Sequence, residues 1–323
     1  MQDIKILDCT LRDGGYINNW CFKDNTNLII ENTLSEAGID FVESGFLTDR
    51  EHSEESSTLY GTTSALKNKI VMVNFGEYDL SKIDNRVEVR LAFKQNVLNR
   101  LEEALSVLSK KKVNFSLNPM HISLYEENEL KQLFELSNKY NPTCVTAVDT
   151  MGIMTEADTE RIFSEFDSHL DKEIGVGFHS HDNLGLSLKN SVMLLSMNID
   201  RTIILDSSLF GIGRGGGMLS TNIIADYLNK NYNKKYNIEM LNNIATKHIS
   251  QYLNYNKKPY FLTAKHKCHP NYGKYLSETK CPIQRFEQFL EQIPNEYKAY
   301  YNKEIIKEIC TNDKKNFLSL KEV

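Results

Sequence analysis

The sequence predicts an α/β protein with the architecture of a (β/α)8 TIM barrel, followed by a short, mostly helical C-terminal appendage. Three observations lead to this prediction: eight short apolar runs lie in the first two-thirds of the chain, amphipathic stretches separate most of them, and the alternation stops near Tyr232. Strands that alternate with helices form a parallel sheet. A count of eight strands favours a closed barrel over a doubly wound sheet, which is the main structural alternative.

The expected strands are runs rich in β-branched and apolar residues. In chain order they cover Ile4–Leu11, Phe41–Phe46, Ile70–Phe75, Val87–Phe93, Asn114–Leu117, Cys144–Val148, Ile174–Phe178 and Thr202–Leu205. Apolar residues at helical spacing predict helices over Asn27–Ala37, Asn96–Leu108 and Tyr125–Tyr140. The connection after the second strand is the least clear, because His52–Thr62 is polar and rich in serine and threonine.

The composition divides the chain into two parts. Residues 1–232 are expected to form a catalytic barrel, and residues 233–323 a helical region in which Asn, Lys and Tyr become frequent. Helical patterns there cover Met240–Leu253, Gln284–Leu290 and Tyr297–Cys310. Because this region is short for an independent catalytic domain, we expect it to pack against the barrel.

Composition and charge exclude several classes of function. The chain has 323 residues, of which 41% are hydrophobic and 25% charged, and its formal charge is −5. Without a long basic run, nucleic-acid binding has little support. No apolar stretch is long enough to cross a membrane, and the N-terminus lacks the pattern of a signal peptide. Six scattered cysteines without a Cys-x-x-Cys pair then predict reduced thiols in a cytoplasmic protein.

The most informative residues are His179 and His181, which end the seventh expected strand. Side chains two apart on a strand point to the same side, so the two imidazoles project together and can bind a divalent metal. Asp13 follows the first strand, which lies two strands away in a closed barrel and can supply a carboxylate. This ligand set leaves coordination positions open, as a catalytic metal requires. The alternative is a hydrogen-bonded strand end without metal.

Other polar residues follow or end strands, where TIM barrels place their active sites. Arg12 adjoins Asp13, and its guanidinium could hold a substrate carboxylate and stabilise oxyanion charge. It could equally pair with Glu43 or Asp149, or do both. Glu43, Arg90 and Asp149 are also candidates for substrate binding, since they lie on or just after strands.

Two further motifs are open to more than one interpretation. The loop Gly211–Gly217 formally satisfies G-x-G-x-x-G, but it follows the last strand, which favours a turn that lets backbone approach the site; phosphate binding is the alternative. His266, Cys268, His269 and Cys281 fit the spacing of no common zinc finger. His269–Tyr272 is either a rigid turn that presents polar side chains or a surface loop.

Five segments together resemble the DRE-TIM metallolyase superfamily, with its domain of the HMG-CoA lyase and pyruvate carboxyltransferase type. They are Asp8–Gly15, Gly38–Phe46, Asp149–Gly152, Phe178–Asn183 and Gly211–Gly215, in that order. The resemblance covers roughly residues 4–225. It is closest in outline to 4-hydroxy-2-oxovalerate aldolase, and the superfamily also includes the homocitrate and isopropylmalate synthases.

The resemblance implies a lyase that makes or breaks a carbon–carbon bond beside a carbonyl. A divalent metal, with manganese first and magnesium, cobalt or zinc as alternatives, would bind Asp13, His179 and His181, and Arg12 would steady an enolate. The implied partners are a small 2-oxo acid such as pyruvate, an aldehyde, further copies of the chain in a homo-oligomer, and a dehydrogenase that consumes the aldehyde.

Departures from the family pattern concern proton transfer. Tyr16 stands where the synthases have glutamine and the aldolase has histidine, and Met218 stands where the family has a metal-binding asparagine. The aldolase also returns a C-terminal tyrosine to its site, and here Tyr272 or Tyr260 could do so. The candidate catalytic residues are therefore Arg12 and, for proton transfer, Tyr16, Tyr272 and His269.

Three functions follow, of which the first is favoured. It is a metal-dependent aldolase that acts on a 4-hydroxy-2-oxo acid. The second is an acyl-CoA-dependent Claisen synthase, which Tyr16 and the short C-terminal region disfavour. The third is a non-catalytic relative that uses the pocket only to bind a carboxylate ligand.

Overall fold

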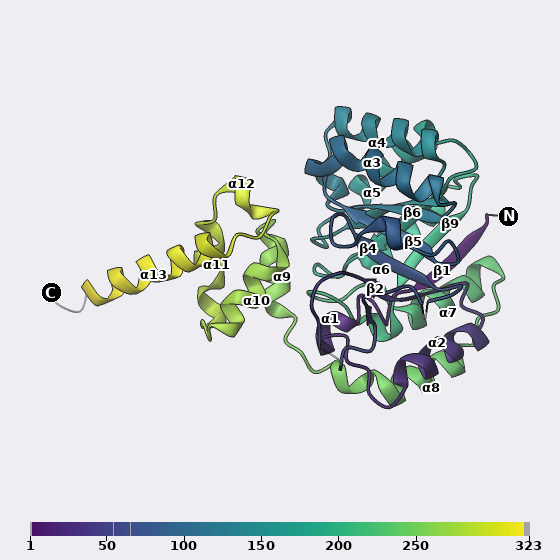
Figure 1. The fold of residues 1–323 in the computed structure, drawn as a ribbon. Helices are drawn as coiled ribbons and strands as arrows, with labels where there is room; N and C mark the ends of the chain where they lie inside the picture. Colours follow the sequence, from purple (N-terminus) through teal and green to yellow (C-terminus); the bar gives the residue numbers. More distant parts are fainter. Residues whose placement is uncertain (1, 54, 65, 320–323) are drawn as a thin grey trace.

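The computed structural model describes residues 2–53, 55–64 and 66–319, and its first two-thirds form a closed barrel of eight parallel strands (Figure 1). Each strand pairs with the next barrel strand along the chain, and β1 closes the barrel by pairing with both β9 and β2. The predicted TIM barrel is confirmed. The barrel strands are β1 Ile4–Asp8, β2 Phe41–Leu47, β4 Ile70–Asn74, β5 Glu88–Phe93, β6 Phe115–Pro119, β7 Cys144–Asp149, β8 Gly175–Ser180 and β9 Ile203–Ser207.

Helices cover the outside of the barrel, because their apolar faces pack on the outward-facing strand residues. They are α2 Thr26–Glu36, α3 Leu98–Lys110, α4 Glu127–Tyr140, α5 Glu156–His169, α6 Ser187–Ser196 and α7 Thr221–Tyr232, and the short α1 Gly15–Asn18 follows β1. In the described residues between β2 and β5, the two-residue strand β3 Leu59–Tyr60 and a 3-10 turn at Leu80–Lys82 replace the usual helices. The polar, serine-rich sequence after β2 offers no apolar face for a helix.

The C-terminal region has two parts. Helix α8, Ile238–His248, packs beside α2 and α7, and the barrel's hydrophobic core extends through Leu241 to Ile249. A second core begins at Leu262 and joins the remaining helices. These helices are α9 Lys258–Lys265, α10 Pro270–Glu278, α11 Phe286–Glu291, α12 Asn295–Lys298 and α13 Lys303–Ser319. We call them the appendage.

The appendage lies as a separate lobe beside the barrel, with α13 pointing away from it (Figure 1). It nevertheless touches residues of the barrel. Arg214 Nη2 lies 2.6 Å from His269 Nε2, and the His121 and Tyr300 rings are 5.3 Å apart between centroids. The boundary between the barrel core and the appendage core therefore lies after α8, later in the chain than the predicted division at residue 232.

None of the helices in the described part of the chain combines the length and the apolar character that crossing a lipid bilayer requires.

Candidate metal centre

The three predicted ligands come together at the C-terminal end of the barrel. Asp13 lies in a tight turn after β1, in which its N–H donates to Cys9 O at 2.8 Å. His179 is in the last part of β8 and His181 follows that strand directly. Each residue offers a ligand atom within 4.8 Å of the other two, and all three are buried. Two imidazoles and one carboxylate form a donor set that suits a divalent transition metal.

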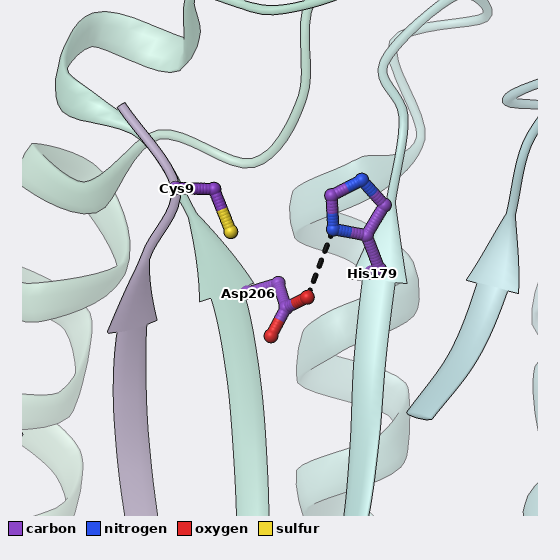
Figure 2. A group of neighbouring side chains, drawn as sticks. All are labelled: Cys9, His179 and Asp206. Carbon is purple, nitrogen blue, oxygen red and sulfur yellow. Dashed lines mark hydrogen bonds and ion pairs between the residues drawn. The ribbon is translucent and has the colours of Figure 1, made fainter. Parts of the chain in front are cut away.

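Both imidazoles are oriented by hydrogen bonds at Nδ1. His179 Nδ1 donates to Asp206 Oδ2 at 2.9 Å, as Figure 2 shows, and its Nε2 lies 3.5 Å from Asp13 Oδ2. His181 Nδ1 donates to Gly217 O at 3.2 Å. A proton held on Nδ1 leaves the Nε2 lone pair available, which is how metal-binding histidines are usually fixed. The donor set therefore fits a metal in tautomer as well as in position.

Asp13 is held from two sides. Its Oδ1 accepts from the backbone N–H of Arg214 at 2.9 Å, and its Oδ2 accepts from Arg12 Nη1 at 2.5 Å. A Cβ at Gly213 would lie 2.6 Å from Asp13 Oδ1, so only glycine permits this close approach of the backbone. The interpretation of Gly211–Gly217 as a turn that brings backbone to the site is thus confirmed.

A closed network of buried ion pairs lies next to the candidate ligands and holds Asp13 and His179 in place. Arg12 Nε donates to Glu43 Oε2 at 2.6 Å, and Arg90 lies 3.2 Å from Glu43 Oε1 and 2.5 Å from Asp206 Oδ2. The circuit runs from Asp13 through Arg12, Glu43, Arg90 and Asp206 to His179 and back to Asp13. Its three carboxylates exceed its two guanidiniums in charge by one, so a bound cation would be electrostatically favoured.

Electrostatics keeps two of the ligands ready for a metal. Burial opposes ionisation of Asp13, but the effect of the adjacent charges, chiefly that of Arg12, is larger and holds the pKa of that carboxyl well below its usual range. Burial lowers the pKa of His181 to about 4, so its imidazole is neutral near pH 7. A deprotonated carboxylate and a neutral imidazole are the forms that bind metals.

Cys9, His179 and Asp206 form a second group with metal-binding side chains (Figure 2). Here burial, together with Asp206 and Glu43, raises the pKa of the Cys9 thiol well above its usual value, so the sulfur stays protonated. Asp206 Oδ2 already accepts from both Arg90 and His179. A metal in this group would need the Cys9 thiol to lose its proton, whereas Asp13 and His181 are already in the forms that bind a metal.

A cavity opens from the candidate ligands toward the appendage. Its inner part is lined by Arg12, Asp13, Tyr16, Asn118, His179, His181 and their apolar neighbours. An outer cavity of about 510 Å³ shares Tyr16, Asn74 and Arg214 with the inner part and continues to His269, Asn271 and Tyr301. His269 and Asn271 stand at the start of α10, so His269–Tyr272 does present polar side chains, as one of its two interpretations expected.

The structure does not bring every predicted residue to this cavity. Tyr272 lies in the core of the appendage, where its hydroxyl donates to Tyr297 O at 2.8 Å. Asp149 accepts from the N–H groups of Ile153 and Met154 and so closes the turn after β7. Glu43 and Arg90 support the ligands from beneath. These residues are placed to maintain structure, while Arg12, Tyr16 and His269 line the cavity.

Zinc binding near Cys268 has no support in the geometry. Cys268 Sγ donates to His266 O at 3.4 Å, and His266 Nε2 lies 3.2 Å from Glu287 Oε1, while His269 faces Arg214. Within the described ranges, the only groups of side chains close enough to share a metal are the two at the barrel mouth.

Three residues of the site were not predicted from the sequence in these roles. Asp206 orients His179, and the register of β8 with β9 places the two directly opposite each other. This neighbour relation was available once the strands were aligned. Arg214 and Lys94 line the outer cavity. Lys94 directly follows β5 and Arg214 lies in the glycine-rich loop, so both positions carried a signal, but the sequence assigned no role to either.

His121 gives a testable pH dependence of folding. It is 2% exposed, and burial followed by the charge of Arg214 lowers its pKa to about 3. Below about pH 6.5 His121 binds a proton in the unfolded chain but stays neutral in the folded chain, so the free energy of unfolding falls as the pH falls. The unfolding free energy of the native protein should therefore fall between about pH 6 and about pH 5, and His121 should account for about 1 kcal/mol of that fall. His121→Asn should remove this contribution, and asparagine suits the left-handed backbone at this position (φ 57°).

Urea unfolding of the metal-free protein at the two pH values measures this effect, with the exposed His52→Asn as control. Equal pH slopes for the native and His121→Asn proteins would show that His121 titrates normally in the folded state.

Comparisons with known proteins agree with this geometry. The HMGL-like family model matches residues 63–250. The chain is 25% identical over 232 residues to 4-hydroxy-2-oxovalerate aldolase of Pseudoalteromonas translucida, with 67% of each chain covered. It is 24% identical over 270 residues to homocitrate synthase AksA of Methanosarcina acetivorans, with 78% of this chain and 65% of that enzyme covered.

Solved structures show the same fold. The N-terminal domain of a candidate aldolase from Bacteroides vulgatus superposes with a TM-score of 0.74 at 25% identity, over 87% of this chain and 98% of that one. HMG-CoA lyase from Brucella melitensis gives a TM-score of 0.59 at 15% identity, over 78% of this chain and all of that one (100%). Because the family model spans more than half of the chain, and the five family motifs occur in the expected sequence order around the candidate metal centre, the protein belongs to the HMGL-like family of DRE-TIM metallolyases.

Proposed function

We propose that this protein is a divalent-metal-dependent aldolase that joins or separates pyruvate and an aldehyde through a pyruvate-type enolate. The observation that carries the proposal is the position of Arg12. Its guanidinium contacts the candidate ligand Asp13 and lines the same cavity as His179 and His181. A fixed cation beside a metal site is what the developing charge of an enolate oxygen requires. The aldolase-named relatives support this kind of chemistry.

The metal would be held by Asp13, His179 and His181, and we propose manganese, with magnesium, cobalt or zinc as alternatives. When bound, it would supply a Lewis acid that polarises the carbonyl of a 2-oxo acid. Arg12 is held rigid by Glu43 and Asp13, so its charge stays aimed into the cavity. Asn118 Nδ2 is buried in the same wall without a protein partner in the described residues, and it can donate a hydrogen bond to a substrate oxygen.

In the synthetic direction, the methylene carbon of the enolate would attack the aldehyde carbon. The new carbon–carbon bond takes the enolate's electron pair, the aldehyde π electrons move to oxygen, and that oxygen then needs a proton. Tyr16 is placed to provide it, because it lines both parts of the cavity. Desolvation of the phenol raises the pKa of Tyr16 above its usual value, so it is protonated at neutral pH and acts as a donor.

Tyr16→Phe should therefore lower kcat for condensation by about a hundredfold or more while the metal content stays the same. Stopped assays with pyruvate and an aldehyde, together with metal analysis, measure both quantities. Tyr301→Phe is the matched control, since it removes a hydroxyl from the outer cavity alone and should have a much smaller effect. Equal losses in the two variants would exclude Tyr16 as the proton donor.

A product assay tests the proposed reaction. The metal-loaded protein is incubated with 4-hydroxy-2-oxo acids, and released pyruvate is measured with lactate dehydrogenase; a parallel assay contains a 2-oxo acid with acyl-CoA and measures free thiol. Pyruvate release supports the aldolase. Thiol release without pyruvate release would assign the protein to the Claisen synthases, which the homocitrate synthase relatives represent. Neither product from a metal-loaded protein would favour the non-catalytic alternative.

A further inference from the structure

We propose that the outer cavity is an anion subsite and that the aldehyde used by this protein carries a carboxylate or phosphate group, recognised by Lys94 and Arg214. This inference rests on the proposed function for the identity of the reacting group, but the anion subsite itself stands on the geometry of the cavity. A neutral aldehyde would leave these two cations without an anionic partner, whereas an anionic one would pair with them.

Two cationic side chains face this cavity without a carboxylate partner in the described residues. Lys94 Nζ lies 5.4 Å from the centroid of the Tyr300 ring, and the Arg214 guanidinium lies 5.7 Å from that of Tyr16. The described ion pairs include neither residue with an acid. Lys94 is an exposed residue; partial desolvation of its ammonium, and then the charge of Arg214, lowers its pKa, while the charge of Glu77 opposes this shift.

Among the described residues, the one carboxylate that lines the outer cavity, Glu77, is already engaged. Glu77 Oε1 lies 2.8 Å from Arg50 Nη2, and its Oε2 accepts from Asn74 Nδ2 at 3.0 Å. Glu77 is therefore balanced by a cation from outside the cavity. The lining keeps the unbalanced charges of Lys94 and Arg214, and an anionic ligand would neutralise them.

Arg214 is held by weak neutral acceptors rather than by an acid. Its Nη2 lies 2.6 Å from His269 Nε2 and 3.4 Å from Asn271 Oδ1. His269 Nδ1 also accepts, from the N–H of Asn271 at 3.2 Å. A neutral imidazole accepts at only one nitrogen, so His269 cannot satisfy both donors. An anionic ligand would give the guanidinium a charged acceptor, which these neutral groups do not provide.

A buried group, His121, independently points to a ligand in the same place. His121 lines the outer cavity, and its Nδ1 is buried with no hydrogen-bond partner in the described residues. A buried polar atom without a partner is costly unless a ligand or water satisfies it. The imidazole stays neutral near Arg214 and Lys94, so His121 would donate or accept one hydrogen bond and add no charge.

The position of the subsite sets the class of substrate. The outer cavity shares Tyr16 and Arg214 with the inner pocket, so its contents are continuous with the reacting centre. Its volume of about 510 Å³ is in the range of small-molecule sites and leaves room for a short carbon chain between aldehyde and anion. The appendage builds one wall through His269, Asn271 and Tyr301, which gives this region a role in substrate selection.

The test compares aldehydes of similar length in condensation with pyruvate: succinic semialdehyde for a carboxylate, glycolaldehyde phosphate for a phosphate, and butanal as the neutral reference. We expect kcat/KM for at least one anionic aldehyde to exceed that for butanal by about tenfold or more. In Lys94→Gln this ratio should fall by about tenfold through KM, and Lys94→Arg should restore most of it. The exposed Lys274→Gln in α10 is the matched control and should keep the native ratio.

Direct binding separates this proposal from the proposed reaction. Inorganic phosphate and succinate are titrated calorimetrically into metal-loaded protein saturated with oxalate, which occupies the inner site. Binding by the native protein and Lys274→Gln that is lost in Lys94→Gln supports the subsite even if no aldehyde reacts. Equal binding by both variants, or a preference for butanal that Lys94→Gln leaves unchanged, would overturn it.

Discussion

Replacing His179 with alanine is expected to remove the metal and to lower the rate of pyruvate enolisation by more than about 100-fold. Losing only a residue that hydrogen-bonds to a metal ligand typically costs about 10- to 100-fold, and His179 is itself a candidate ligand. The substitution deletes one of three candidate ligands. It also removes the group that links Asp13 to Asp206, because His179 lies 3.5 Å from the first and 2.9 Å from the second. Metal content per chain and the rate of proton exchange are the two quantities to measure.

Two controls define what this loss means. Asp206→Asn keeps a hydrogen-bond acceptor for His179 Nδ1 and should weaken metal affinity by a smaller factor, about 10- to 100-fold. His52→Ala removes an exposed histidine that belongs to neither group of candidate ligands, and it should leave metal content unchanged. A His179→Ala protein that folds and retains one metal per chain would show that the ligands lie elsewhere.

Arg90→Met should be the most destabilising of the substitutions considered, with a loss of about 3–5 kcal/mol in unfolding free energy. Arg90 is 2% exposed, and its guanidinium lies between Glu43 and Asp206. Methionine fills part of the volume but leaves these two buried carboxylates without that cation. Denaturant unfolding of the metal-free protein measures the change.

The matched control for Arg90→Met is Arg86→Met, because Arg86 pairs with Asp84 on the exposed surface just before β5. Exposed pairs contribute little, so this variant should unfold close to the native midpoint. If the two variants were equally stable, the buried circuit would not be holding the site together. A stable Arg90→Met protein that had lost activity would instead restore the predicted substrate role of Arg90.

The fold was predictable because each strand and helix carries its own pattern, and the differences are local. The first strand was expected to run from Ile4 to Leu11, but it ends at Asp8. The apolar pattern continues beyond that point, yet the N–H groups of Arg12, Asp13 and Gly14 all donate to Cys9 O and turn the chain. The hydrophobic pattern of a sequence indicates which residues are buried. A buried turn that follows a strand therefore has the same pattern as a continuation of the strand.

The barrel half of the site was predictable from strand ends, whereas the half contributed by the appendage was predictable only in part. Sequence alone does not say which residues of a distant helical region reach the barrel mouth: His269 and Tyr272 were both considered, and the structure places His269 at the outer cavity, with Asn271 and Tyr301, but Tyr272 in the core of the appendage. The helical spacing of apolar residues around Tyr272 indicated that its side chain is buried in a helix core and does not reach the cavity. Leu276 follows it by one turn, and both belong to the buried face of α10.

Exchange of the pyruvate methyl protons in D₂O, followed by NMR with and without a divalent metal, tests whether Asp13, His179 and His181 hold the metal of an enolate-forming enzyme. We expect the metal-loaded native protein to exchange these protons. Chelation should stop the exchange, returned metal should restore it, and His179→Ala should lack it under all conditions. Exchange that persists at the same rate after chelation, or in His179→Ala, would contradict the assignment of Asp13, His179 and His181 as the metal ligands of an enolate-forming enzyme.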